Sequence, residues 1–201
     1  MKFNPEIHHR QSIRLRDYNY SRAGAYFVTV CVFERECLFG ELVDGEMRLN
    51  EAGRMVRECW DGIPDHFPHV ELDAFIIMPN HLHGIFVLND DASIVGARHA
   101  SPDFPVRTAE TGRATHARAT HASPLRGPGP EPRSIGAMVG SFKPAVTKRI
   151  NQSRNTPGAP VWQRNYYERV IRGERELDGI RRYIVDNPAK WAEDENHPSR
   201  V

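Results

Sequence analysis

Two strands and a tight turn are predicted from the run Phe75-Ile-Ile-Met-Pro-Asn-His-Leu-His-Gly-Ile-Phe-Val-Leu88. Apolar residues fill both halves, and only a Pro-Asn pair separates them, so strands at Val70–Met78 and His81–Leu88 should pair antiparallel. His81 and His83 stand two residues apart on the second strand, where alternate side chains share a face. Two imidazoles placed in this way can grip one metal ion. Most isolated His-x-His pairs simply face solvent, so other parts of the sequence are needed to show whether this pair is a metal site.

Three more strands are predicted nearer the N-terminus. Ala25 to Phe33 is rich in β-branched and aromatic residues, as buried strands are. Leu38 to Val43 and Glu46 to Leu49 flank Asp44-Gly45, a dipeptide typical of tight hairpins. The first part of the chain therefore holds four or five antiparallel strands.

Helices are predicted mainly after these strands. Asn50 can cap a helix that ends at Gly62-Ile-Pro64, and Ser134 can cap a long amphipathic helix. Pro144 lies inside the second pattern and predicts a kink or a break near Gly140.

Two shorter helical patterns follow towards the C-terminus. Asn165 and Glu168 resemble a capping box for a short helix that Gly173 interrupts. A last helix stops before Asn187-Pro188 and is defined by three apolar residues at helical spacing, Leu177, Ile180 and Ile184. The order of elements predicts an α+β fold, in which helices pack on one face of an antiparallel sheet.

The length of 201 residues predicts a single domain, 1–201. Residues 90–132 change character: Pro, Gly, Ser, Thr and Ala dominate, and large apolar residues are almost absent. Such a segment cannot offset the entropy of ordering, so we expect a flexible insertion there. It contains a direct duplication, Arg113-Ala-Thr-His-Ala117 and Arg118-Ala-Thr-His-Ala122, whose histidines are more typical of a solvated linker than of a metal site.

Charge is unevenly distributed although the net charge is +1. Residues 34–73 hold four arginines and eleven acidic residues, whereas residues 133–182 hold eleven basic and four acidic residues. A basic C-terminal third is typical of proteins that bind polyanions.

Cys31, Cys37 and Cys59 have no Cys-x-x-Cys spacing, so neither a disulfide framework nor a zinc ribbon is indicated. No run approaches the roughly 18 apolar residues of a membrane span, and the first residues lack the apolar core of a signal peptide. We therefore expect a cytoplasmic protein without a membrane partner.

A second reactive group is found in Val161-Trp-Gln-Arg-Asn-Tyr-Tyr-Glu-Arg-Val-Ile-Arg172, where Tyr166 and Tyr167 stand among arginines. A phenol has a pKa of about 10 and is a poor nucleophile at neutral pH unless a neighbour stabilises its anion or polarises its target. A divalent ion at His81 and His83 would do both. The spacing does not choose between the two tyrosines.

These motifs resemble the REP-associated tyrosine transposases, which belong to the single-tyrosine HUH (His, hydrophobic, His) transposases related to the IS200-like enzymes. The resemblance covers nearly the whole chain except the insertion, and it rests on five segments: Met78 to Gly84, Arg14-Leu-Arg-Asp-Tyr18, Ser134 to Lys143, Trp162 to Arg172 and Tyr183-Ile-Val-Asp-Asn-Pro188. It implies a ferredoxin-like HUH endonuclease fold. It also implies a monomer or homodimer that cleaves and rejoins single-stranded DNA at hairpin-forming repetitive palindromes through a 5′-phosphotyrosine intermediate.

The resemblance assigns roles to individual residues. His81 and His83 match the metal ligands, for Mg²⁺ or Mn²⁺; Tyr167 matches the nucleophile, and Tyr166 an aromatic position that packs. The chain departs from the pattern at Arg169, where members commonly carry a histidine. A third metal ligand is left open, with Glu168, Asn80 or water as candidates.

Basic residues are expected to meet the DNA phosphates, which position a strand without reading its sequence. The candidates are Arg14, Arg16, Lys143, Lys148, Arg149, Arg164 and Arg172. For each of them a surface salt bridge is the plain alternative.

Three other functions remain open at this stage. A domesticated, catalytically silent hairpin-binding protein is suggested by Arg169. A metal-dependent nuclease could use water in place of tyrosine. A plain RNA-binding sheet would use the histidines only for stability.

Overall fold

The computed structural model describes residues 19–89 and 131–200. Arg14, Arg16 and nearly all of the predicted 90–132 insertion lie outside the described residues. The strands are β1 (Gly24–Cys31), β2 (Gly40–Val43), β3 (Glu46–Leu49), β4 (Val70–Met78), β5 (His81–Leu88) and β6 (Tyr167–Ile171). The α-helices are α1 (Glu51–Asp61), α2 (Ile63–His66), α3 (Ile135–Arg154) and α4 (Glu174–Asp186), and the 3₁₀ helices are η1 (Phe33–Arg35), η2 (Pro188–Glu193) and η3 (Pro198–Arg200).

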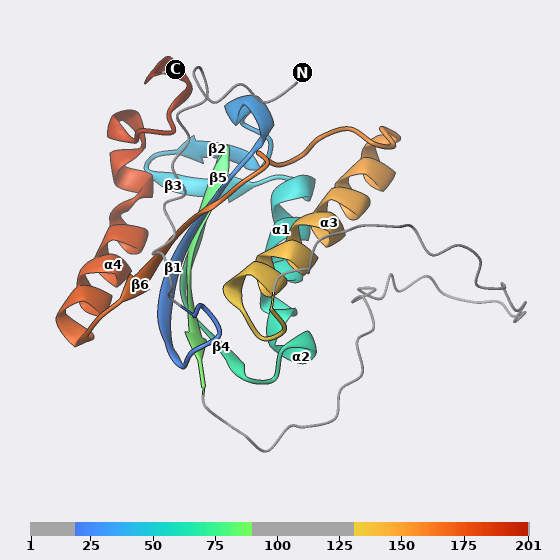
Figure 1. Cartoon of the computed structure of the whole chain (residues 1–201). Helices are drawn as coiled ribbons and strands as arrows, with labels where there is room; N and C mark the ends of the chain where they lie inside the picture. Colours follow the sequence, from blue (N-terminus) through green and yellow to red (C-terminus); the bar gives the residue numbers. More distant parts are fainter. Residues whose placement is uncertain (1–18, 90–130, 201) are drawn as a thin grey trace, which may run out of the picture.

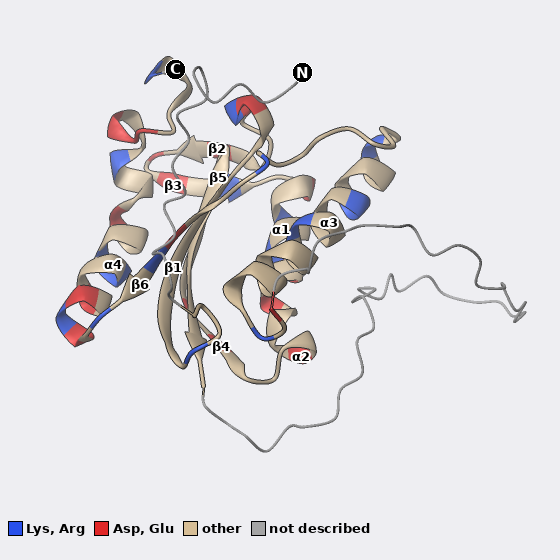
Figure 2. Ribbon diagram, in the orientation of Figure 1, with Lys and Arg blue, Asp and Glu red and all other residues tan. Residues whose placement is uncertain are grey.

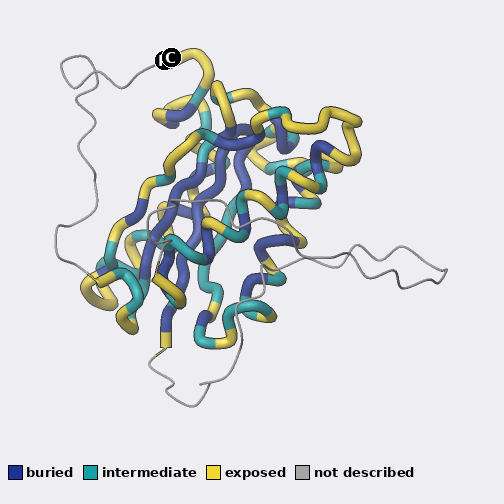
Figure 3. The backbone as a smooth tube through the Cα atoms, turned by 45° about the vertical axis from the view of Figure 1, so that its right-hand side comes forward, coloured by how far each residue is buried: buried dark blue, intermediate teal, exposed yellow. Residues whose placement is uncertain are grey.

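Four strands form one antiparallel sheet in the order β4-β5-β1-β6, and β2 and β3 form a separate hairpin. The predicted α+β class and antiparallel sheet are confirmed. Figure 1 shows α1 and α3 on one face of the sheet and α4 on the other, whereas the sequence predicted helices on one face only. The sheet is consequently covered on both sides, and its central strands β1 and β5 are mostly buried (Figure 3).

The larger core lies between the sheet and helices α1 and α3. Trp60 of α1 stacks on Phe75 and Phe86, with ring centroids 4.4 and 4.6 Å away. Gly84 of β5 lies beneath the Trp60 ring, because a Cβ at this position would overlap the indole. The glycine of the His-Leu-His-Gly run is therefore explained by close packing between α1 and the sheet.

A smaller core lies between the sheet and α4. Phe27, Ile85, Ile171 and Ile184 form it. His83 stands two residues before Ile85 on β5, so its side chain points to the same face as this core. The side chains that face the histidines therefore depend on how α4 packs against the sheet.

The predicted helix caps are confirmed. The side chain of Asn50 accepts a hydrogen bond from Gly53 N at 3.0 Å, and that of Ser134 accepts one from Ala137 N at 3.2 Å. The chain also turns at Asp44-Gly45 with both φ angles positive, as a tight hairpin requires. Helix α3 is a single helix that contains Pro144, so the predicted break does not occur.

The predicted short helix after Asn165 is wrong, because this segment is strand β6 paired with β1. Ile171 packs in the α4 core, whereas Val170 packs towards the larger core. This alternation is the period of a strand, and pairing with β1 outweighs the local capping-box pattern. Within the described residues, no helix is long and apolar enough to cross a membrane.

Candidate metal centre

The two histidines of β5 face each other at its first residues. Their Nε2 atoms are 3.1 Å apart, and both side chains are almost fully buried. Two nitrogens that each lie about 2.1 Å from one ion, at an angle near 95°, would be separated by about 3 Å. The predicted pairing of His81 and His83 is therefore observed, and the spacing fits a shared cation.

Asn80 fixes the orientation of the His81 ring. Its Nδ2 donates to two carbonyl oxygens, Arg35 O at 3.0 Å and Asn196 O at 2.8 Å. Its Oδ1 is thereby turned to His81 Nδ1, 2.9 Å away, and accepts the proton of that nitrogen. The lone pair of His81 is left on Nε2, the atom that faces His83.

The His83 ring is held from the neighbouring strand. Its Nδ1 lies 2.8 Å from the hydroxyl of Thr29, its partner on β1, and its ring stacks on Phe27 at 5.4 Å. Partners of this kind set ring orientation and tautomer in metal sites. Asn80, Thr29 and Phe27 thus hold the two rings so that their Nε2 atoms face each other.

Asp194 brings a carboxylate to the same place. Its Oδ2 is 3.8 Å from His81 Nε2, and the ligand atoms of Asp194, His81 and His83 all lie within 4.8 Å of one another. The residue is buried, and its Oδ1 accepts a hydrogen bond from Asn196 N at 2.6 Å. Two imidazoles and one carboxylate are a suitable donor set for a divalent ion.

The sequence did not indicate Asp194 as a third ligand. Of the candidates it offered, Glu168 pairs with Val28, which packs in the larger core, so it points to the opposite face of the sheet from the histidines. Asn80 acts through its hydrogen bond to His81 instead. Asp194 belongs to the segment after η2, which is held by hydrogen bonds from Arg35 of η1 and from Asn80, the residue before β5.

Burial keeps both imidazoles neutral. Loss of solvation lowers the pKa of His81 to about 3, and the charge of Arg35 adds to this. Burial likewise lowers the pKa of His83 to about 3, with His81 contributing and Asp194 opposing. The neutral form is the one that binds metal, so the pair is ready to coordinate throughout the physiological pH range.

Tyr183 of α4 is the phenol that touches the histidines. Its hydroxyl lies 3.3 Å from His83 Nε2, and the two rings are 5.2 Å apart. Burial raises the pKa of Tyr183, and Asp194 adds to the effect, while a hydrogen bond from Asn187 opposes it. Asn187 stands one helical turn further on; it is buried, and its Oδ1 has no hydrogen-bond partner among the described residues.

Tyr167, the nucleophile implied by the resemblance, lies farther along the same face. It pairs with Thr29, which pairs in turn with His83 on the other side, so two inter-strand spacings, roughly 10 Å, separate the backbones of Tyr167 and His83. Its ring is 37% exposed and contacts Phe27 edge-on at 6.3 Å. The predicted packing of Tyr166 is confirmed, because this ring lies against the larger core.

The predicted DNA-binding cations have different surroundings. Lys143 is half-buried, donates to Gln163 O at 2.5 Å, and has its pKa lowered by burial. Arg149 forms an ion pair with Glu58. Basic residues are spread over α3 and α4 in Figure 2, and three of the candidates are exposed: Lys148, Arg164 and Arg172. The salt-bridge alternative therefore holds for Arg149, and Lys143 has a structural contact.

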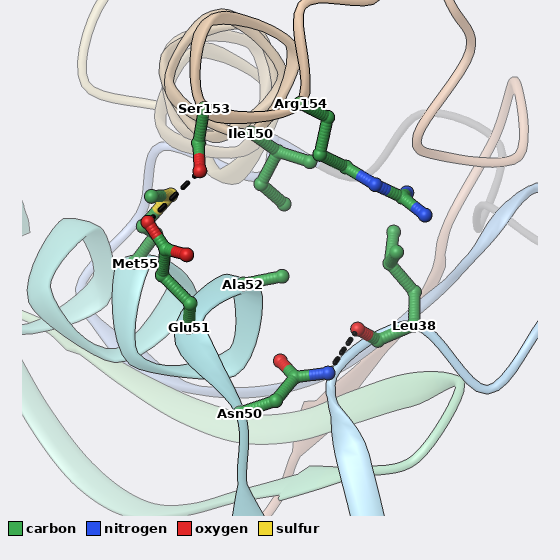
Figure 4. A pocket seen from close by; sticks show the side chains of 8 residues that line it. All are labelled: Leu38, Asn50, Glu51, Ala52, Met55, Ile150, Ser153 and Arg154. Carbon is green, nitrogen blue, oxygen red and sulfur yellow. Dashed lines mark hydrogen bonds between the residues drawn. The ribbon is translucent and has the colours of Figure 1, made fainter.

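Two hollows lie away from the histidines. One, of about 230 Å³, lies between α1 and α3, where Ser153 donates to Glu51 at 2.8 Å (Figure 4). None of the predicted site residues lines it. The other, of about 410 Å³, follows the edge strand β6 and includes Tyr167.

Comparison with known proteins agrees with this architecture. The chain is 41% identical to an uncharacterized protein of Haemophilus influenzae over 194 residues, which cover 96% of each protein. A solved structure of a REP-associated tyrosine transposase bound to a REP hairpin has 17% identity and a TM-score of 0.54, over 90% of this chain and 74% of that one. No protein-family profile matches.

The chain therefore belongs to the family of the Haemophilus protein. It has the fold of a REP-associated tyrosine transposase, and the resemblance predicted from the motifs is confirmed at the level of the fold.

Proposed function

We propose that the protein is a transposase-type endonuclease and strand transferase that cuts and rejoins single-stranded DNA beside hairpins. The observation that carries the proposal is a phenol hydroxyl 3.3 Å from a buried histidine pair that also faces a carboxylate. A nucleophile, two imidazole ligands and an anionic ligand are the groups that metal-assisted phosphoryl transfer requires. The related fold bound to a REP hairpin supports hairpin DNA as the substrate.

Tyr183 is the nucleophile that the geometry favours. Its oxygen would attack a backbone phosphorus, forming an O–P bond while the bond to the 3′-oxygen breaks. The phenol loses its proton as the new bond forms, and the leaving 3′-oxygen takes up a proton, so the products are a 5′-phosphotyrosine and a free 3′-hydroxyl. A bound Mg²⁺ or Mn²⁺ would supply the charge that polarises the phosphoryl oxygen. Since the link retains the free energy of the phosphodiester, another 3′-hydroxyl can reverse the step and join strands.

His81, His83 and Asp194 would hold the metal, and Asn187 would hold the Tyr183 hydroxyl or offer its unpartnered Oδ1 as a further oxygen ligand. Tyr167 remains the nucleophile that the sequence resemblance implies. It lies within the same row of side chains but is separated from the pair by Phe27.

The alternative of a catalytically silent, hairpin-binding protein was suggested by Arg169, and this argument is weakened if Tyr183 is the nucleophile. Arg169 lies two residues after Tyr167 and forms an ion pair with Glu176 at 2.6 Å, so its departure from the family pattern does not concern Tyr183. We place the reaction in the cytoplasm, where thiols stay reduced, since Cys31, Cys37 and Cys59 are all free.

The test is incubation of a single-stranded hairpin oligonucleotide, labelled at either end, with the protein and Mn²⁺, followed by denaturing electrophoresis. The 3′ label should move with the protein, and the 5′ label should appear in a short free fragment. Tyr183→Phe or a chelator should abolish both signals, and Tyr167→Phe should keep them. Short free fragments with both labels would indicate a nuclease that uses water, and uncut DNA would refute the proposal.

A further inference from the structure

The free edge of the sheet carries a hollow of about 410 Å³ along β6, which we call the edge pocket. It is lined by Tyr20, Tyr167, Glu168, Arg169, Val170, Arg172 and Glu176. Successive residues of β6 point to opposite faces, and both sets line the pocket. The hollow therefore lies over the edge of the sheet.

Tyr167 offers this pocket an aromatic surface. Its ring is 37% exposed, and its hydroxyl has no hydrogen-bond partner in the part of the chain that the structure describes. Among the described residues, its ring contacts the ring of Phe27 edge-on, so a face of the Tyr167 ring remains available for stacking. Nucleobases stack on such rings whatever their sequence.

The charges of the pocket suit a nucleotide better than an isolated anion. Arg169 and Glu176 neutralise each other in an ion pair, and Glu176 also accepts from the backbone N of Arg172. Arg172 is exposed, and its guanidinium has no ion pair among residues 19–89 and 131–200. Glu168 also lines the pocket, but its side chain is buried and accepts a hydrogen bond from Tyr166. Arg172 is therefore the exposed cation beside the Tyr167 ring, and the two match one phosphate and one base.

The pocket also lies in line with the metal centre. Tyr167, Thr29 and His83 form a single row across β6, β1 and β5, on the face that α4 covers. Roughly 10 Å separates the two ends of this row. The edge pocket and the histidine pair therefore belong to the same face of the sheet, with the buried side chains of Phe27 and Thr29 between them.

We propose that the edge pocket binds one unpaired nucleotide of the strand being processed, with its base stacked on Tyr167 and its phosphate beside Arg172. The inference rests on the proposed function for its ligand class, and it gives Tyr167 a role in positioning the strand. Binding of a flanking nucleotide would set which phosphate meets Tyr183.

The test measures affinity for a hairpin with single-stranded flanks in the presence of chelator, so that no strand is cut. Each flanking position is replaced in turn by an abasic site. One position should lose affinity with the wild-type protein by about 5- to 100-fold. Tyr167→Ala should show the same loss with the intact oligonucleotide and no additional loss at that abasic position, whereas Tyr167→Phe should behave as wild type.

Arg172→Gln tests the phosphate contact, with Arg175→Gln as a matched control on exposed α4. The slope of log affinity against log salt should fall in magnitude by about 0.7 in Arg172→Gln and stay unchanged in Arg175→Gln. A flat abasic scan, or an equal loss in Tyr167→Ala at every position, would overturn the inference. So would a change in oligomeric state in Tyr167→Ala without a change in DNA affinity, because the edge would then be a surface between copies.

The two proposals fail in different ways. An abasic effect at one position without any covalent DNA adduct would retain the edge pocket and refute strand transfer. An adduct on Tyr183 with a flat abasic scan would support strand transfer and refute the edge pocket.

Discussion

Two buried imidazoles should make the stability of this protein fall steeply below neutral pH. The pKa values of His81 and His83 are lowered by burial from about 6.5 to about 3. As pH falls, the unfolded chain therefore takes up protons first, and the folded state does not follow until about pH 3. Above pH 6.5 the two histidines leave the free energy of unfolding unchanged. Between pH 6.5 and about 3 they lower it progressively as the pH falls.

The magnitude follows from the width of this window. Each histidine contributes about 1.4 kcal/mol per pH unit once the unfolded chain is protonated, so the pair contributes about 2.7 kcal/mol per unit. Between pH 7 and pH 5 the loss is about 4 kcal/mol, a large part of the stability of a typical domain. The assay is urea unfolding at several pH values with chelator present, for wild type and for His83→Gln.

His83→Gln should flatten the dependence of unfolding free energy on pH by about 1.4 kcal/mol per unit over the range from 6 to 4. Titrating groups away from the histidine pair are common to both proteins, so they cancel in the comparison. Parallel curves for the two proteins would mean that His83 titrates normally, and the account of a dry, preformed ligand pair would be refuted.

Three other substitutions test the surroundings of the site and the packing of the fold. Asn80→Ala should weaken Mn²⁺ binding by about 10- to 100-fold in calorimetry, because the His81 ring loses the acceptor that orients it; affinity equal to wild type would contradict this. Gly84→Ala should lower the free energy of unfolding by about 1 to 3 kcal/mol in urea, since the new methyl group overlaps Trp60; an unchanged midpoint would show that the ring moves aside freely. Ser134→Ala should cost about 1 kcal/mol by loss of the α3 cap, with metal affinity intact; a loss of metal affinity in this variant would link the α3 cap to the site.

The sequence was sufficient where the determinants are local. The hairpin at Asp44-Gly45, the caps Asn50 and Ser134, and the paired strands around Pro79-Asn80 each depend on neighbours in the chain, and all were predicted correctly. The pairing of His81 with His83 is local in the same sense, because it needs only the two-residue period of a strand.

The features that were missed depend on contacts between distant segments. Strand β6 has a mixed polar sequence and is a strand because its backbone pairs with that of β1. Asp194 reaches the histidines because Asn80 binds Asn196 O. No periodicity in the sequence encodes either contact.

Tyr183 illustrates the limit most clearly. Its motif was recognised and its helix was predicted, yet its role depends on which face of the sheet α4 covers. The family resemblance assigned the nucleophile to Tyr167, and the predicted arrangement of helices on one face gave no reason to consider Tyr183. Packing of Ile184 against Phe27 and Ile85 on the opposite face brings Tyr183 to His83 instead.

Identification of the modified residue tests the central claim most directly. The protein is incubated with the hairpin oligonucleotide and Mn²⁺, digested with nuclease and protease, and the peptide that retains a nucleotide is sequenced by mass spectrometry. We expect a nucleotide mass on Tyr183. A nucleotide on Tyr167, with Tyr183 unmodified, would contradict the account.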